Sequence, residues 1–476
     1  MRRIVGPEAV IADPAELAAY ECDGLTAFKH PPDLVVLPET ADQVQAVVRV
    51  CREEGVVFVP RGAGTGLSGG ALPVEGGVLI GLSRMNRILE IDLPNQRAVV
   101  EPGVVNIWLS ERLAPHGYYY APDPASQRAC TIGGNVAENS GGPHCLKYGV
   151  TTNHVLGLEV VLPDGERVHL GGRVCDPLGY DLVGVFVGSE GTFGIATAIE
   201  VRILKTPEAV RTLLAVFDEM DDASNAVSGI IAAGIIPAAV EMMDNLSIQA
   251  VEAAVQAGYP TDAGAVLLVE LDGPAAGLDA QAAVIEGVLR ANRVREIRVA
   301  RDEAERAALW KGRKHAFGAM GRISPDYYVQ DAVIPRTRLM PILRVVAEAA
   351  ARHGLRVANV FHAGDGNLHP LILYDGSRPG QLEAAEAAGA EIMQACIAAG
   401  GSITGEHGVG IEKRDFMPLM FSEADLEAMR KLKAVFNPDG RLNPGKIFPT
   451  QRACGEVASS HRAPHPIEVA GLAQRF

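Results

Sequence analysis

The sequence predicts an α+β protein of two domains and a short tail. Residues 56–207 alternate short β-branched runs with glycine-rich stretches, which is typical of strands joined by loops. After Pro207, alanine-rich helical periodicities alternate with apolar runs, which indicates an antiparallel sheet covered by helices. We therefore expect a first domain over residues 1–207, a second domain over 208–449 and a surface tail over 450–476.

The composition is that of an ordinary soluble protein with an ample core. The chain has 476 residues, of which 48% are hydrophobic and 21% charged. Its net charge of −15 argues against nucleic acid as a partner. The seven cysteines form no CxxC pair, so the sequence suggests neither a disulfide framework nor an iron–sulfur site, and it fits a reducing compartment.

The beginning of the chain does not look like a targeting segment. The stretch MRRIVGPEAVIADPAE has too short an apolar run for a signal peptide, with proline and acidic residues early in it. Apolar stretches elsewhere are interrupted well before the roughly 20 residues that a membrane helix needs. We expect a cytoplasmic protein whose contact with the inner face of the membrane is at most peripheral, through its partners.

The first element with a clear pattern is a helix. Residues 41–54 place apolar side chains at helical spacing, with Thr40 or Asp42 as a cap and Gly55 as the end. The β-branched and aromatic run that follows, over 56–60, predicts a strand.

That strand leads into PRGAGTGLSGGALP, residues 60–73, which contains a literal GxGxxG. A dinucleotide fingerprint needs a helix after the glycines, but Pro73 and the glycines behind it oppose one, and residues 78–82 indicate another strand. The match is therefore accidental. Successive glycine N–H groups still form an anion-binding nest, and a merely flexible surface loop is the alternative. Further donors come from Arg61, Thr65 and Ser68.

Two more glycine-rich tracts follow, over residues 131–142 and 188–195. Between them, LGLEVVLPDGERVHL reads as two strands joined by a Pro-Asp-Gly turn. Three such tracts in one domain suggest that several loops converge on an extended ligand. In the second domain we expect helices over 221–233, 246–257, 276–291 and 302–320, and strands over 265–271 and 295–300.

The most informative stretch of the second domain is RVANVFHAGDGNLHPLILY, residues 356–374. An Asp-Gly turn at Asp365 and Gly366 would make a two-residue hairpin that places His362 directly opposite His369. Opposed side chains on one face have Cβ atoms roughly 4.5–5.5 Å apart, and two imidazoles at that spacing can share one metal ion. Two structural histidines on a hairpin are the alternative.

A third metal ligand must come from elsewhere in the chain. The stretch GGSITGEHGVGIEK, residues 400–413, offers Glu406 and His407 in another glycine-rich loop. Asp365 is a further candidate, although a role in the turn explains it as well. Two histidines and one carboxylate would leave coordination positions open, as a catalytic metal requires.

These motifs resemble a known family. PRGAGTGLSGGALP, APDPASQRACTIGGNVAENSGG, LKYGVT and GSEGTFGI resemble the FAD-binding domain of the vanillyl-alcohol-oxidase type. FHAGDGNLHP, GEHGVGIEK and FNPDGRLNPGK resemble the C-terminal domain of its D-2-hydroxyacid dehydrogenase branch. Within that branch, YECDGLTAF, EMMDNLSI and GRISPDYY resemble the FAD-binding subunits of bacterial glycolate oxidases. The resemblance covers roughly residues 18–449 and implies a two-domain flavoprotein with a cap domain for the substrate.

The resemblance implies which residues hold the cofactor. Some relatives tether the flavin through a histidine in the first glycine loop, and this loop has none, so we expect FAD to be held non-covalently. The implied cofactor residues are Arg61, Gly62, Ala63, Gly64, Thr65, Gly66, Asp123, Ser126, Gly133, Gly134, Asn135, Glu190, Gly191 and Ile195.

The resemblance also implies a divalent metal, zinc or manganese. In family members with a metal, the positions that match His362, His369 and Glu406 are its ligands, and the position that matches His407 is the acid–base residue. A substrate carboxylate needs a cation as well, and a guanidinium matches it in bidentate fashion. We favour Arg313, then Arg322, over the alternative that this basic stretch is only a solvated face.

The implied activity is oxidation of a small 2-hydroxy acid by hydride transfer to FAD, with electrons passed to a quinone or to an iron–sulfur subunit. The 2-hydroxyglutarate branch has Asn where this chain has Leu371 and Lys where it has Val329. These departures favour a small monocarboxylate, glycolate first and D-lactate second. The alternatives are a D-lactate or D-2-hydroxyglutarate dehydrogenase or oxidase acting alone, or a scaffold subunit that only binds flavin and metal.

Overall fold

The strand before the glycine loop leads into a small parallel sheet. The computed structural model describes residues 1–173 and 179–449, and the predicted tail over 450–476 lies outside them. Between Arg61 and Val78 the chain makes turns and no helix, so the glycine loop is not a dinucleotide fingerprint. The strands, in spatial order, are β1 (Val10–Ile11), β2 (Leu34–Val36), β4 (Val78–Gly81) and β3 (Phe58–Arg61), with β1 antiparallel.

The predicted helix over 41–54 is confirmed as α3 (Ala41–Glu53). Thr40 caps it, because its hydroxyl accepts a hydrogen bond from the Gln43 N–H at 3.2 Å. The buried valines and Cys51 of α3 belong to the same core cluster as Val36, Phe58 and Ile80 of the parallel sheet. The helix thereby supports β3, the strand that begins the glycine loop.

A second, antiparallel sheet completes the first domain. The predicted Pro-Asp-Gly turn is confirmed over residues 162–165, where the Gly165 N–H donates to Leu162 O and two paired strands are joined. The strand order is β5 (Ile88–Asp92), β6 (Arg97–Val100), β10 (Ile195–Arg202), β8 (Val155–Val161) and β9 (Arg167–Gly171), with a separate pair of β7 (Tyr118–Tyr119) and β11 (Leu204–Lys205). Helices of this domain are α1 (Arg2–Val5), α2 (Pro14–Leu17), α4 (Asn106–Leu113), α5 (Ile132–Glu138), α6 (Cys145–Tyr148) and α7 (Leu182–Phe186).

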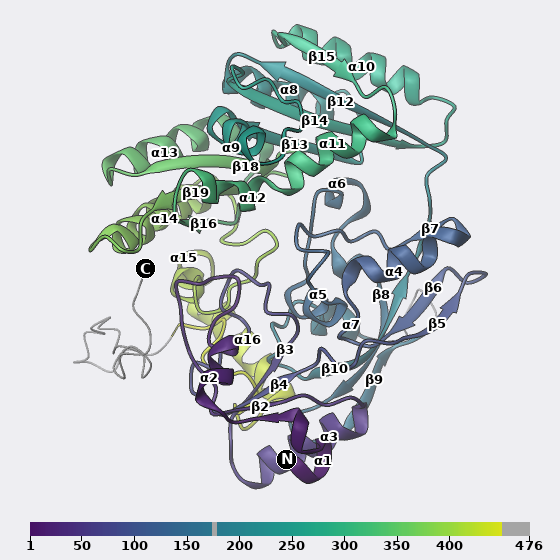
Figure 1. Cartoon of the computed structure of the whole chain (residues 1–476), viewed down its shortest axis with the longest axis vertical. Coiled ribbons are helices and arrows are strands. Elements are labelled where there is room, and N and C mark those ends of the chain that lie inside the picture. The colour runs from purple at the N-terminus through teal and green to yellow at the C-terminus, as the bar shows by residue number, and fades with distance from the viewer. Residues whose placement is uncertain (174–178, 450–476) are drawn as a thin grey trace.

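The second domain is an antiparallel sheet covered by helices, as predicted (Figure 1). In spatial order its strands are β15 (Glu296–Val299), β12 (Ala209–Phe217), β14 (Ala265–Gly273), β13 (Ala239–Asp244), β18 (Arg356–His362), β19 (Asn367–Tyr374) and β16 (Asp326–Val329), with β17 (Ala332–Val333) also on β19. The helices are α8 (Met220–Ala232), α9 (Asn245–Val255), α10 (Leu278–Ala291), α11 (Glu303–Lys314), α12 (Ala316–Ala319), α13 (Leu339–Arg352) and α14 (Gln381–Ala398).

The two faces of this sheet have separate cores. Helices α8, α10, α13 and α14 bury one face, whereas α9, α11 and α12 bury the other. The helix predicted over 302–320 is interrupted at His315, which divides it into α11 and α12. The second face is the one that carries the site described below.

After the second sheet, the chain returns to the first domain. Helix α15 (Met417–Met420) contacts α14 of the second domain, and α16 (Glu423–Phe436), coloured yellow-green in Figure 1, ends at Phe436, whose ring stacks on Phe193 of the first domain. Leu442 then forms a parallel bridge with Phe58, and the Asn443 N–H donates to Phe58 O at 2.8 Å. The Lys446 ammonium donates to Leu72 O at 2.6 Å. The end of the described chain is thereby anchored on the first domain, next to the glycine loop.

Candidate active site

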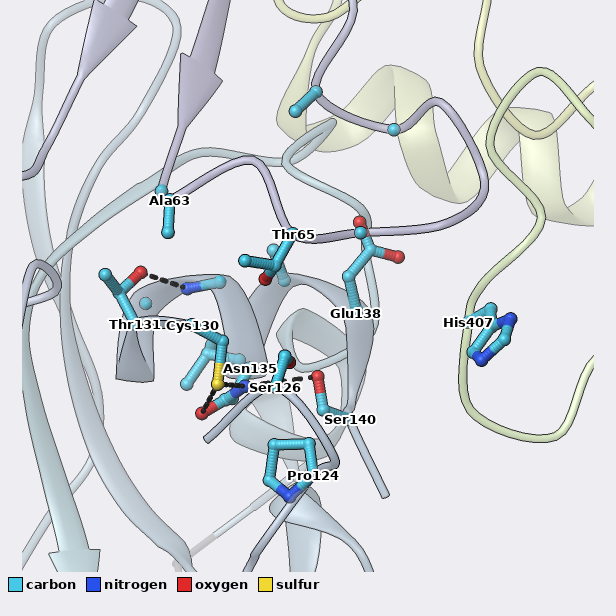
Figure 2. Close-up of a pocket in the computed structure, with 18 of the residues that line it drawn as sticks. Ala63, Thr65, Pro124, Ser126, Cys130, Thr131, Asn135, Glu138, Ser140 and His407 are labelled. Atoms are coloured by element: carbon cyan, nitrogen blue, oxygen red, sulfur yellow. Dashed lines mark hydrogen bonds between the residues drawn. The ribbon is translucent and has the colours of Figure 1, made fainter. Parts of the chain in front are cut away.

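A cavity of about 370 Å³ lies between the two domains. Figure 2 shows side chains of α5 on one side of it and His407, from a segment near the C-terminus, on the other. The first domain contributes the glycine loop over 60–67, α5 and the turn over 189–196. The second domain contributes Arg313, Lys314, Phe317, Tyr327, His362, His369, Glu406 and His407.

The glycine loop fits closely against its neighbours. A Cβ on Gly62 would lie 2.6 Å from the Thr131 hydroxyl, and one on Gly64 would lie 2.2 Å from the Arg61 guanidinium. Gly64 also has a φ of +71°, which residues with a side chain adopt only with strain. The loop is therefore fixed in place rather than loose, and its backbone forms part of the cavity wall.

The second glycine tract is a helix where we expected a loop. Thr131 caps α5 by accepting a hydrogen bond from the Gly134 N–H at 3.3 Å, which allows helix to form across two glycines. A Cβ on Gly133 would lie 2.5 Å from Pro102, so glycine is needed for close packing. The buried Asn135 accepts from the Asn106 amide at 2.9 Å, which fixes α5 against α4.

The third tract connects the two domains. Glu190 has a φ of +52°, and its carboxylate accepts hydrogen bonds from the N–H groups of Val409 at 2.7 Å and Gly410 at 2.6 Å. The Asn443 amide donates to Glu190 O at 2.7 Å. Glu190 therefore holds the segment over 404–410, called the 404–410 loop below, against the first-domain wall of the cavity.

The histidine hairpin forms, but its register differs from the prediction. His362 pairs with Asn367, and Val360 pairs with His369, so the connection has four residues instead of two. The cause is a tertiary contact, because the Gly364 N–H donates to Val240 O of β13 at 3.0 Å. The shift is two residues, which preserves the face, and the two imidazole centroids lie 5.2 Å apart as diagonal neighbours.

Glu406 comes close to both histidines. Its Oε1 lies 3.2 Å from His362 Nε2 and 3.4 Å from His369 Nε2. Burial opposes the charge of this carboxylate, but the histidines, His362 most strongly, outweigh burial and lower the pKa of Glu406 to about 2. Burial likewise disfavours charge on His362, yet Glu241 and Glu406 raise its pKa well above the ordinary value. The hairpin and the 404–410 loop thus build one cluster of charged groups.

His407 lies on the other side of this cluster. Its ring stacks on that of His369, with centroids 4.9 Å apart and planes 3° from parallel. Burial is the main cause that lowers the pKa of His407 to about 4, and Asp331 opposes the shift. The imidazole is therefore neutral at physiological pH and has a lone pair with which to accept a proton.

Asp331, which the sequence analysis missed, fixes the 404–410 loop. This fully buried carboxylate accepts from the Thr404 hydroxyl at 2.6 Å and from the N–H groups of Gly405 at 2.9 Å and His407 at 3.0 Å. The Lys413 ammonium lies 3.2 Å away. An acidic residue inside the apolar run YYVQDAVIP was the available signal, since a charge is buried only with partners.

Three cations near the cavity differ in their burial and their partners. Arg313 lines the cavity and is 2% exposed, and its Nη2 lies 2.5 Å from a Glu241 oxygen. Lys314 also lines the cavity, and its ammonium donates to Asp123 at 3.3 Å. Arg322 is exposed and does not line the cavity, so the structure places it outside the site.

Comparisons with known proteins agree with this geometry. Residues 206–447 match the family described as FAD linked oxidases, C-terminal domain, and residues 32–171 match the family described as FAD binding domain. The chain belongs to the FAD-linked oxidases. It is 51% identical to the glycolate oxidase subunit GlcD of Escherichia coli (strain K12), over 94% of this chain and 89% of that one.

This FAD-linked oxidase has further relatives that are named glycolate oxidase subunit and D-lactate dehydrogenase. It is 40% identical to the glycolate oxidase subunit GlcD of Bacillus subtilis, over 94% and 95% of the two chains. It is 30% identical to a probable mitochondrial D-lactate dehydrogenase of Danio rerio, over 94% and 90%. Among solved structures, p-cresol methylhydroxylase superposes with a TM-score of 0.81 at 19% identity, covering 94% of this chain and 95% of that one. The predicted two-domain flavoprotein fold is confirmed.

The cavity of this FAD-linked oxidase fits its cofactor. Several of the buried polar atoms without a hydrogen-bond partner in the described chain lie in or next to the first-domain wall, namely those of Arg61, Ser68, Glu138 and Ser189. Such atoms are costly unless a ligand or water satisfies them. Of the predicted cofactor residues, Asp123 alone does not line the cavity, because its carboxylate is paired with His144 and Lys314.

Two sets of side chains have donors close enough for a metal ion. One is His362, His369 and Glu406, and the other is Asp331, His369 and His407, with ligand atoms within 4.8 Å in each. In the second set, the oxygens of Asp331 are already occupied by the 404–410 loop and Lys413. Neither ring nitrogen of His369, which belongs to both sets, makes a hydrogen bond among the described residues. The first set, which is the predicted one, therefore fits a metal ion better.

Proposed function

We propose that this FAD-linked oxidase oxidises a small 2-hydroxy acid, glycolate in preference to D-lactate. The observation that carries the proposal is the position of His407, a neutral histidine that lines the cavity. The fixed glycine loop forms the opposite wall of this cavity, and the buried Arg313 also lines it. The names of the relatives, glycolate oxidase subunit and D-lactate dehydrogenase, support the substrate class.

The residues of the chain divide the work between binding and proton transfer. Arg313, together with Lys314, would bind the substrate carboxylate, since both cations line the cavity. His407 would take the hydroxyl proton, a contribution of typically 10²–10⁴-fold. The glycine loop and α5 would hold the FAD, which supplies the hydride acceptor when it is bound. Its non-covalent binding stays a prediction.

Two apolar residues on the site's side of the sheet favour a monocarboxylate. Leu371 and Val329, where the 2-hydroxyglutarate branch has Asn and Lys, are direct cross-strand partners on β19 and β16. Both are buried in the apolar core on the site's side of the sheet, at 0% and 5% exposure. An apolar pair at this position supplies no partner for a second carboxylate.

Anaerobic titration with hydroxy acids tests the proposal. Stoichiometric glycolate should bleach the flavin absorbance of the purified holoenzyme, D-lactate should do so less readily, and D-2-hydroxyglutarate and L-lactate should leave it largely oxidised. If neither glycolate nor D-lactate bleaches the flavin, the proposed function is wrong. That result would favour a scaffold that only binds flavin.

We further propose that His362, His369 and Glu406 bind a divalent metal, zinc or manganese. Such an ion would polarise the substrate hydroxyl and lower its pKa. Alanine at each of the three positions should abolish stoichiometric metal while FAD content stays near wild type, because the ligands lie on the second-domain wall. Metal analysis of the purified variants decides this. Full metal content in all three would refute the site, and exposed His169→Ala is the control.

Electrons from this chain would pass to a separate iron–sulfur subunit. The relatives named GlcD are subunits, which supports a partner. Within the described residues, the groups that could hold a metal contain no cysteine, and the described cysteines are free. Iron analysis of proteins that co-purify with the native chain tests this. A lone chain that reduces quinone or O₂ as fast as the native extract would rule the partner out.

A further inference from the structure

Glu241 is a buried carboxylate directly behind the histidine hairpin. It lies on β13, and this strand pairs with β18, which ends at His362. The residue is 1% exposed and projects into the face of the sheet that α9, α11 and α12 cover. A charge in such an apolar position is tolerated only when partners compensate it.

Two partners do so, and both belong to the site. Each carboxylate oxygen of Glu241 lies 2.9 Å from His362 Nδ1. One of them also lies 2.5 Å from Arg313 Nη2, and this nitrogen lies 3.4 Å from the same His362 Nδ1. A single carboxylate therefore contacts one proposed metal ligand and the proposed binding group for the substrate carboxylate.

The contact with His362 selects which ring nitrogen faces the cavity. Since a carboxylate only accepts hydrogen bonds, Nδ1 must carry the proton that it shares with Glu241. The other nitrogen, Nε2, then points to Glu406 at 3.2 Å. Histidines that bind metals almost always donate their second N–H to a carboxylate, carbonyl or water, and loss of that partner typically weakens metal binding 10–100-fold.

The contact with Arg313 fixes the guanidinium. Arg313 comes from α11, on a different element from the hairpin, and is itself only 2% exposed. A buried ion pair at 2.5 Å removes the rotamer freedom that an arginine otherwise has. The guanidinium that would bind the substrate carboxylate is thus held at a fixed distance from His362.

We propose that Glu241 is a positioning residue that orients His362 for the metal and Arg313 for the substrate carboxylate at the same time. The metal half rests on the proposed function. Neither role requires Glu241 to touch substrate or cofactor, and Glu241 does not line the cavity.

The test is Glu241→Gln in the holoenzyme, compared with Glu270→Gln. Glu270 lies on the neighbouring strand β14, is 2% exposed and is paired with Arg306 and His144, so the control removes a similar buried charge away from His362. Chelator competition with Zn²⁺ or Mn²⁺ should show 10–100-fold weaker metal binding in Glu241→Gln and unchanged binding in Glu270→Gln. FAD content should match wild type in both, and KM for glycolate should rise in Glu241→Gln only.

Each outcome decides something different. Wild-type metal affinity and KM in Glu241→Gln would overturn this inference alone, while a wild-type chain that binds no metal would overturn the metal site and this inference together. An equal loss of metal in both variants would show a general structural effect and would also overturn it. If Glu241→Gln does not fold, Glu241→Asp keeps the charge but withdraws it from both partners. Metal binding should then weaken in the same direction, and unchanged metal affinity would overturn the inference.

Discussion

His362 and His407 show how neighbouring residues give one residue type two roles. His362 lies between two carboxylates, Glu241 and Glu406, which raise its pKa despite burial. His407 has no carboxylate in such close contact through its ring, and burial lowers its pKa to about 4. Pairs of titratable groups with pKa values pushed apart are typical of acid–base sites. The two surroundings suit His362 to be fixed in place by carboxylates and His407 to accept a proton.

Replacing His407 should separate binding from chemistry. His407→Ala should keep metal content and substrate affinity but reduce the flavin 10²–10⁴-fold more slowly, because a base acts mainly in the transition state. Stopped-flow measurement of anaerobic flavin reduction by glycolate gives the rate. His169→Ala is the control, since its side chain is 74% exposed on β9. Reduction of the His407 variant at the wild-type rate across pH would exclude it as the base.

At the scale of elements, local patterns predicted the strands and helices well but not how they were connected in detail. Asp365 and Gly366 read as a two-residue turn, yet Gly364 donates to Val240 and the Gly364 carbonyl accepts from Arg336, which draws the turn into a longer loop. Those partners lie far away in the chain, so no local pattern contains them. The face of the hairpin was still predicted correctly, because side chains alternate and the register moved by two.

The same limit explains the site residues. Glycine content predicted a loop over 131–142. The cap at Thr131 and the close packing on Pro102 instead allow a helix over 132–138. Residue type favoured Arg313 and then Arg322 as carboxylate-binding groups, but of these two only Arg313 lines the cavity, because the helix is interrupted at His315. The pair of His362 and His369 followed from the hairpin spacing, whereas the choice of Glu406 as the third ligand followed from motif resemblance.

Asp331 offers a test at this scale, because it fixes the whole 404–410 loop. Asp331→Asn replaces an acceptor by a donor that faces backbone N–H groups and removes the nearer of the two carboxylates that pair with the buried Lys413. We expect a loss of about 3–5 kcal/mol in the free energy of unfolding and weaker metal binding. Denaturant unfolding measures the first, with Asp326→Asn on β16, whose carboxylate accepts only from the Gly376 N–H and is less buried, as the control. A stability change equal to that of the control would contradict the role of Asp331.

At the scale of the whole molecule, the cavity exists only where the two domains meet. The first domain supplies the glycine loop, and the second domain supplies the charged side chains of the cavity. The distance between the loop and these side chains therefore depends on the interface between the domains. Glu190 is one contact across it, and Lys147 with Tyr148 on Asp272 is another. A third contact involves His144, whose ring lies 2.9 Å from Asp123 and 3.5 Å from Glu270 of β14.

His144 should make the stability of this interface depend on pH. Burial disfavours its charge, but Asp123 and Glu270 outweigh burial and raise its pKa to about 10. Since this folded-state pKa lies above the unfolded value of about 6.5, the stabilisation is complete below pH 6.5 and is lost as the pH rises towards 10. The loss amounts to at most about 1.4 kcal/mol per pH unit. Thermal unfolding at pH 7 and pH 9.5 should therefore show a larger fall for wild type than for His144→Gln, with exposed His169→Gln behaving as wild type. Equal falls in wild type and His144→Gln would mean that the charge of His144 does not hold the domains together.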